Sequence, residues 1–170
     1  MRNTTYKKIL LAVFIIFLYT ISGCFESPEG AWGDAPDFTV KTIDGGTFIL
    51  SDHLGTVIVI DFMATWCGPC RTQMNELSKV HSEVGNDTII LSLAPFYESE
   101  QDIQSTFEEY VDMWIFAIDN TDENVAEKYN VQVIPTLYII DTKGDISYGS
   151  GMSGVTDKDK LLQEIEEARK

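Results

Sequence analysis

Runs of apolar residues after about residue 35 predict a β-sheet. Three continuous runs are rich in β-branched residues, a pattern typical of strands buried on both faces: residues 57–63, 88–94 and 114–118. Residues 38–50 alternate on either side of an Asp44-Gly45-Gly46 turn, which predicts an opening hairpin. Residues 136–148 turn at 141–144 and predict a closing hairpin.

Apolar residues spaced three and four apart predict helices between these strands. The longest begins near Pro69, which suits a first helical turn, and carries one apolar stripe: Met74, Leu77, Val80 and Val84. Residues 99–112 and 123–129 predict two more helices, and residues 156–159 form a capping-box-like start for a last one. Helices that alternate with strands predict an α/β fold, with one central mixed sheet flanked by helices.

The N-terminal hydrophobic segment predicts export. Residues 1–8 are basic without an acid, and the 13 mostly apolar residues 9–21 follow. As a helix they would rise only about 20 Å, less than the roughly 30 Å hydrocarbon core of a bilayer, so they read as a signal-peptide core. The residues that follow, Ile21-Ser22-Gly23-Cys24, resemble the lipobox of prokaryotic lipoproteins. There the cysteine thiol is linked to diacylglycerol and the peptide is cut just before it.

We therefore expect a lipoprotein signal peptide over 1–23, a tether over 24–34 with Cys24 lipidated, and one folded domain over 35–170. Two acyl chains give stable anchoring where one is marginal. The alternative is an uncleaved signal anchor. Either arrangement places the domain at the extracytoplasmic face of the cell membrane, in a periplasm or at the cell surface.

The net charge of the chain limits the classes of molecule that it can bind. The 170 residues suit a single domain and carry a net charge of −15. Without residues 1–23, nine basic residues remain against 27 acidic ones, a net charge of −18. Such a surface repels phosphates and anionic lipid head groups, so we expect no nucleic acid partner. Positively charged proteins fit better.

Cys67 and Cys70 form a pair at the predicted start of a helix. Unpaired backbone N–H groups and the helix dipole favour a negative charge there, and the thiolate is the nucleophile in disulfide exchange. Cys67 lies nearer the predicted solvent edge and is the candidate for attack, whereas Cys70 would resolve the mixed disulfide. Two intervening residues let the sulfurs bond while the helix stays intact, so the spacing predicts a redox disulfide.

Two other uses of these cysteines fit less well. A closed zinc site needs four ligands, and the chain has no second CxxC and only two scattered histidines. A one-cysteine peroxide reductase would need proline at Ile60 and Ser or Thr at Ala64. We expect no metal and no cofactor.

The segment from Asp61 to Arg71, DFMATWCGPCR, and the Ile134-Pro135-Thr136 segment that begins 64 residues after Cys70 resemble thioredoxin-fold proteins. With the opening hairpin and the helical insertion over 99–112, the chain is most similar to the membrane-tethered TlpA/ResA-type thiol–disulfide oxidoreductases. The resemblance implies a thioredoxin-like fold and a cis peptide before Pro135, packed against the disulfide. It also implies that an extended substrate segment pairs with the backbone of Ile134.

Four neighbours of the cysteines gain roles from the resemblance. Asp61 interrupts an apolar run, where an ionised carboxylate is costly without partners. It matches the buried thioredoxin acid that accepts the Cys70 proton through water, although a strand-end residue facing solvent is the alternative. Trp66 would shape the substrate contact face, or simply be a core aromatic. Gly68 and Pro69 are the thioredoxin pair and complete the contact surface.

Three departures from the family pattern limit what can be carried over. Residues 88–94 lack the lysine that accompanies the acid in thioredoxins, so the tuning of Asp61 differs. Gln73 replaces a glutamate common in tethered relatives, and Asn75 replaces a helix-kinking proline. Both substitutions argue against a specificity for cytochrome maturation.

The predicted function is the reduction of protein disulfides outside the membrane by Cys67 and Cys70. Gly-Pro between the cysteines favours a reducing potential, near −270 mV in thioredoxin itself. The partners would be protein thiols and disulfides and a membrane thiol carrier that supplies electrons. Two alternatives remain: a non-catalytic thioredoxin-fold binding module with a permanent disulfide, and a disulfide oxidant or isomerase.

Overall fold

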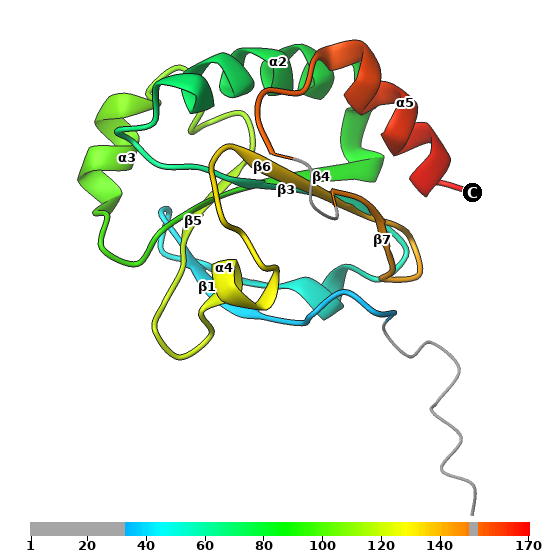
Figure 1. The fold of residues 1–170 in the computed structure, drawn as a ribbon, viewed down its shortest axis with the longest axis horizontal. Coiled ribbons are helices and arrows are strands. Elements are labelled where there is room, and N and C mark those ends of the chain that lie inside the picture. The colour runs from blue at the N-terminus through cyan, green and yellow to red at the C-terminus, as the bar shows by residue number, and fades with distance from the viewer. Residues whose placement is uncertain (1–32, 150–152) are drawn as a thin grey trace, which may run out of the picture. The chain divides into compact units, whose positions relative to one another are not determined.

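A computed structural model describes residues 33–149 and 153–170, which form one mixed seven-stranded sheet (Figure 1). The sheet order is β2-β1-β5-β4-β3-β6-β7. The strands are β1 (Thr39–Thr42), β2 (Thr47–Ile49), β3 (Val57–Phe62), β4 (Thr88–Ala94), β5 (Ile115–Ile118), β6 (Thr136–Ile140) and β7 (Ile146–Tyr148). Both predicted hairpins are confirmed, β1 with β2 and β6 with β7.

The centre of the sheet aligns the segments that carry the candidate chemistry. Strands β3, β4 and β5 run parallel, and β6 lies antiparallel to β3. In this register Asp61 of β3 lies between Ser92 of β4 and Leu137 of β6. Phe62 pairs with Thr136, so Pro135 lies at the end of the sheet from which the chain continues to Cys67.

Helices cover both faces of the sheet (Figure 1). Helices α2 (Gly68–Val84), α3 (Glu100–Thr106) and α5 (Lys158–Ala168) lie on one face, and the short α4 (Val125–Lys128) lies on the other. Two 3₁₀ turns, η1 (Leu50–His53) and η2 (Gly85–Asp87), complete the elements. Within the described ranges, no helix has the length and apolar character needed to cross a bilayer.

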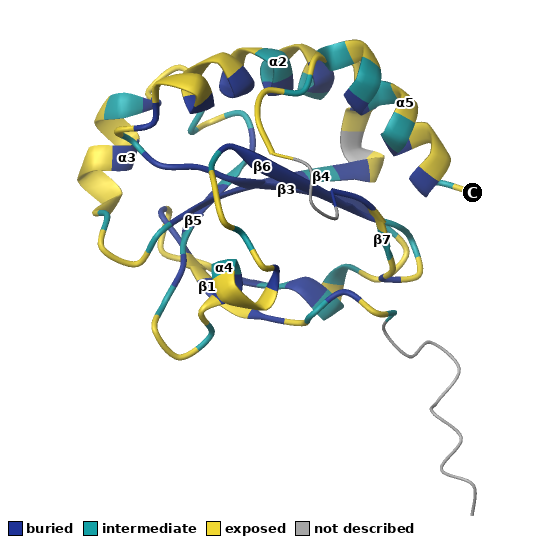
Figure 2. Ribbon diagram, in the orientation of Figure 1, coloured by how far each residue is buried: buried dark blue, intermediate teal, exposed yellow. Residues whose placement is uncertain are grey.

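The core has two parts, one on each face of the sheet (Figure 2). Every residue of β3 and β6 is buried, as the continuous apolar runs predict. The α2 stripe is also confirmed, because Met74, Leu77, Val80 and Val84 are all buried against the sheet. The same part of the core contains both cysteines.

The helix predicted over 99–112 is wrong in its second half. Helix α3 ends at Thr106, and Phe107 leaves helical geometry with ψ near 28°. Two tight turns follow, in which the amides of Tyr110 and Met113 bond three residues back. They allow Tyr110 to pack against Trp114 and Phe107 against Phe116 in tilted ring contacts, so aromatic packing overrides the helical pattern.

The helix predicted over 123–129 is shorter than expected. It begins only at Val125, because Asn124 adopts a left-handed conformation and the side chain of Asn120 accepts bonds from the amides of Asp122 and Glu123. The predicted signal peptide (1–23), Cys24 and nearly all of the tether (24–34) lie outside the described residues.

Candidate active site

The Cys67–Cys70 disulfide lies at the first turn of α2. Cys67 is the N-cap residue, and its Sγ accepts a hydrogen bond of 3.1 Å from the Cys70 amide. The sulfurs are bonded at 2.03 Å. Cys67 keeps 4% of its surface exposed and Cys70 none, whereas Gly68 and Pro69 between them are exposed. The surface that this turn offers to solvent is therefore formed by Gly68, Pro69 and the edge of Cys67.

The first turn of α2 has no acidic side chain that would destabilise a Cys67 thiolate. Residues at the start of α2 include no acid, and backbone N–H groups at a helix start favour an anion. The bond from the Cys70 amide to Cys67 Sγ is of the kind that stabilises an ionised sulfur at this position. The geometry thus favours Cys67 as the nucleophile.

The loop before β6 carries the predicted cis peptide. The bond between Ile134 and Pro135 is cis. Pro135 is buried, its carbonyl accepts a bond of 2.8 Å from the Gly154 amide, and Ile134 is half-buried against both parts of the core. The loop therefore has a fixed backbone at the end of the sheet where the disulfide lies.

Asp61 is fully buried on the face of the sheet that α2 covers. Its Oδ2 accepts a bond of 3.2 Å from Ser92 Oγ, and its Oδ1 has no partner among the described residues. Burial raises the pKa of this carboxyl from 3.8 to about 7, and the Ser92 bond opposes that rise only in part. The alternative that Asp61 faces solvent at a strand end is therefore wrong.

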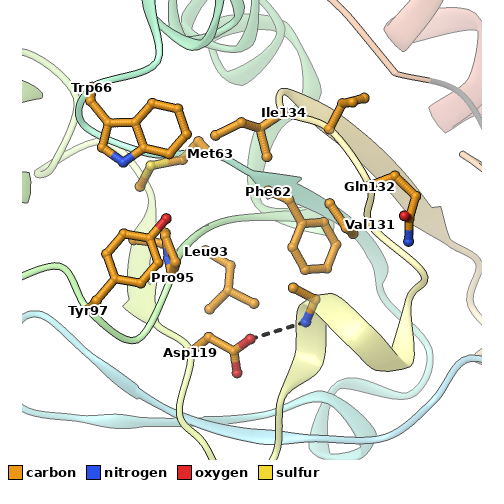
Figure 3. A pocket seen from close by; sticks show the side chains of 13 residues that line it. Phe62, Met63, Trp66, Leu93, Pro95, Tyr97, Asp119, Val131, Gln132 and Ile134 are labelled. Atoms are coloured by element: carbon orange, nitrogen blue, oxygen red, sulfur yellow. Dashed lines mark hydrogen bonds between the residues drawn. The ribbon is translucent and has the colours of Figure 1, made fainter.

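Trp66 does not pack into the core. Its side chain is 66% exposed and forms one wall of a cavity of about 430 Å³ that opens beside the disulfide turn (Figure 3). Ile134 also lines this cavity. The other lining residues are mostly apolar: Phe62, Met63, Leu93, Ala94, Pro95, Tyr97, Asp119, Ala126, Val131, Gln132 and Val133.

The one acid of this cavity is already fully engaged. Asp119 accepts bonds of 2.7, 3.0 and 3.1 Å from the backbone amides of Asn120, Val125 and Ala126. Its carboxylate thus holds the start of α4, as the dashed bond in Figure 3 illustrates. The cavity therefore presents an apolar surface to a ligand. No cluster of three or more His, Cys, Asp or Glu side chains in the described ranges could hold a metal ion.

Two polar contacts fix the loops around the disulfide. The Glu98 carboxylate accepts bonds of 3.0 and 3.1 Å from the Thr65 amide and one of 3.0 Å from its hydroxyl, just before Trp66. On α2 the fully buried Gln73 amide joins the backbone of Thr156 through bonds of 2.7 and 3.1 Å. Sequence reasoning missed both contacts, as well as Ser92. Its position as a polar residue inside the apolar run 89–94 was the only signal for Ser92.

Residues 33–149 match the model of the AhpC/TSA family over more than half of the chain. The chain belongs to the AhpC/TSA family. Among the relatives of this AhpC/TSA protein, thiol–disulfide oxidoreductase ResA of Bacillus cereus is 30% identical over 154 residues, which cover 82% of this chain and 87% of ResA. The thioredoxin-like protein YneN of Bacillus subtilis is 33% identical over 114 residues, 66% of either chain.

Solved structures agree with the fold of this AhpC/TSA protein. The exposed lipoprotein thioredoxin Etrx1 of Streptococcus pneumoniae is 26% identical and superposes with a TM-score of 0.67, covering 78% of this chain and 99% of that one. A thiol:disulfide interchange protein DsbE from Chlorobium tepidum is 27% identical with a TM-score of 0.69, covering 81% and 97%. The predicted thioredoxin-like fold is confirmed, and the protein is a thiol–disulfide oxidoreductase.

Proposed function

We propose that this protein reduces disulfides of other proteins outside the cytoplasm, while Cys24 anchors it to the membrane by a lipid. The observation that carries the catalytic part is the Cys67–Cys70 disulfide at the start of α2, beside an apolar cavity. A permanent structural bridge would gain nothing from an open contact surface at this turn. A redox pair needs one, because the substrate sulfur must reach Cys67.

The chemistry begins from the reduced dithiol. The Cys67 thiolate attacks one sulfur of the substrate disulfide, a mixed disulfide forms, and the other substrate sulfur leaves as a thiolate that takes a proton. Cys70 then gives its proton to Asp61, and the Cys70 thiolate attacks Cys67 Sγ. The second substrate sulfur leaves and is protonated. The substrate has gained two electrons, and the protein holds the disulfide seen here.

Asp61 suits the role of proton acceptor. It is the buried carboxylate on the α2 face, and a pKa of about 7 allows both of its protonation states near neutral pH. A carboxyl at its ordinary pKa would remain ionised and would return a proton poorly. Burial in the α2 half of the core thus raises the proton affinity of Asp61 to the level that proton transfer to and from a thiol requires.

The cavity between Trp66 and Ile134 supports a contact with an extended protein segment. Its lining includes an exposed aromatic ring, Trp66, and Ile134, whose backbone is expected to pair with the substrate. Tyr97 and Val133, which also line it, are exposed at 63% and 53%. We infer that the substrate places an apolar side chain in this cavity while its disulfide faces Cys67.

Location and electron supply are inferred from the N-terminus and from relatives. Residues 21–24 resemble a lipobox, and the similar pneumococcal protein is an exposed lipoprotein. A reductant in that location needs electrons from the membrane, so we propose a membrane thiol carrier as the donor. The excess of acid residues on the chain favours basic partners.

Cysteine variants of the full chain test the catalytic proposal. C67S should abolish the reduction of a protein-disulfide reporter. C70S should instead accumulate mixed disulfides, visible on a non-reducing gel. The third cysteine supplies the matched control, because C24S should retain full activity in solution. Activity in C67S, or no mixed disulfide with C70S, would contradict the assigned roles.

A further inference from the structure

A chain of three polar side chains crosses the core beneath the disulfide helix. The Trp114 indole Nε1–H donates to Ser92 Oγ at 3.0 Å, and Ser92 Oγ lies 3.2 Å from Asp61 Oδ2. Ser92 and Asp61 are fully buried, and Trp114 is 9% exposed. The three groups come from neighbouring strands or their ends, in the sheet order β5, β4, β3. The core therefore contains a hydrogen-bonded path that ends on the carboxylate.

The direction of this path follows from the donors and acceptors available. An indole N–H can only donate, so Ser92 Oγ must accept from it. The single hydroxyl proton of Ser92 is then left for another acceptor. The two candidates are Asp61 Oδ2 and the Met74 thioether sulfur at 3.9 Å, which is a weak acceptor. Ser92 therefore donates to Asp61 Oδ2.

The indole that begins the path is held in place by its ring contacts. Trp114 stacks on Phe116 at 5.7 Å and lies 5.6 Å from Tyr110 and 5.9 Å from His81, between ring centroids. An indole packed in this way keeps its N–H aimed at Ser92. The serine hydroxyl is thus oriented from behind and cannot turn away from Asp61 without breaking a buried bond.

We propose that Ser92, oriented by Trp114, is a positioning residue that reserves Asp61 Oδ1 as the atom that takes and returns the Cys70 proton. Oδ2 is occupied as an acceptor, whereas Oδ1 has no partner within the described part of the chain. The inference rests on the proposed role of Asp61 in resolving the mixed disulfide. Thioredoxins have a lysine beside the buried acid, and this chain has none in residues 88–94. The proposal assigns the adjustment of the Asp61 pKa to the neutral Ser92 hydroxyl instead.

Among the described residues, Ser92 is the one hydrogen-bond partner that shifts the pKa of Asp61. Asp61 faces Ser92 on β4, Leu137 on β6 and the α2 side of the core. The titratable groups of this part of the core are the two cysteines, Tyr110 and Tyr148, and neither tyrosine bonds Asp61. The shift of its pKa has two causes, burial and the Ser92 bond. His81 is separated from Asp61 by the Trp114 ring and Ser92. Removal of the hydroxyl should therefore act on Asp61 directly.

The test is a pH titration of the Asp61 carboxyl in the reduced full-length protein, by NMR of ¹³C-labelled aspartate, with D61N assigning the signal. Ser92 stabilises the ionised form, so S92A should raise the pKa by about one unit. W114F should raise it by less, because the hydroxyl stays but loses its orientation. S92T keeps the hydroxyl and should restore the wild-type value.

T88A is the matched control, since it removes a hydroxyl from the same strand that bonds Arg169 instead of Asp61. Its titration should equal that of the wild type. Equal pKa values in S92A, W114F and the wild type would overturn the proposal, and W114F decides alone if S92A does not fold. The titration needs no substrate, so its outcome is separate from that of the C67S assay, which tests the proposed function.

Discussion

The buried Asp61 carboxyl makes the stability of this protein depend on pH. The folded state holds its proton up to a pKa of about 7, whereas the unfolded chain releases it near 3.8. Between these values the unfolded state binds fewer protons, so stability falls as pH rises. The loss is complete above about pH 7, where the buried carboxylate is ionised. A core carboxyl is thus retained at a cost in stability, which fits a role in catalysis.

D61N should remove this pH dependence from the oxidised protein. At about pH 5 only part of the penalty is present in the wild type, because the folded carboxyl is still protonated while that of the unfolded chain is already ionised. The difference in stability between the variant and the wild type at this pH is the baseline. At about pH 8 the variant should be the more stable one, by roughly 3 kcal/mol relative to that baseline. Urea unfolding of both proteins at the two pH values measures the difference. A difference that does not change with pH would show that Asp61 titrates normally.

Single residues were predicted from the sequence where their chemistry stands out. Cys67, Cys70 and Asp61 could be found because thiols at CxxC spacing and an acid in an apolar strand are conspicuous. Ser92 could not, because a hydroxyl in a strand is ordinary until its neighbours are known. Its partners come from β3 and the start of β5, and sequence spacing does not reveal which strands are adjacent.

At the scale of elements, α2 is tied to the segment that leads into α5. The Gln73 amide accepts from the Thr156 amide and donates to its carbonyl. The same segment is bonded to Pro135 through Gly154, and Ser153 forms a bridge to Thr136. The cysteine helix and the cis-proline loop are therefore connected through residues 153–156.

Q73L should weaken this connection. The substitution leaves the amide and carbonyl of Thr156 without their partners, so we expect a loss of about 2 kcal/mol in the free energy of unfolding. Urea denaturation measures it, and Q163L, at an exposed position of α5, is the matched control with no expected change. Equal midpoints for Q73L and Q163L would mean that the Gln73 contact contributes nothing.

Among the features of the secondary structure, the lengths of the helices were predicted least well. The pattern over 99–112 continues past the end of α3, because Phe107, Tyr110 and Val111 are spaced as on a helix but pack from two tight turns. Helical and turn conformations can bury the same residues here. The aromatic partners Trp114 and Phe116, which lie beyond residue 112 just before and on β5, decide between the two conformations.

At the scale of the whole molecule, the proposed lipid anchor depends on Cys24. C24S should lose acyl labelling and should no longer fractionate with the membrane as a processed lipoprotein. C67S, which changes a cysteine of the folded domain, should fractionate as the wild type does. If the wild type and C24S are equally membrane-bound, and neither is cleaved before residue 24, then residues 9–21 act as a signal anchor. The lipid proposal would then be wrong.

The central claim, that Cys67 and Cys70 form a reducing redox pair, is tested most directly by their reduction potential. Equilibration of the full chain with defined thiol–disulfide buffers gives this value. We predict a potential close to that of thioredoxin, about −270 mV. A value well below about −300 mV would indicate a permanent disulfide in a binding module, and one near −120 mV would indicate an oxidant. Either result would contradict the proposed direction of electron flow.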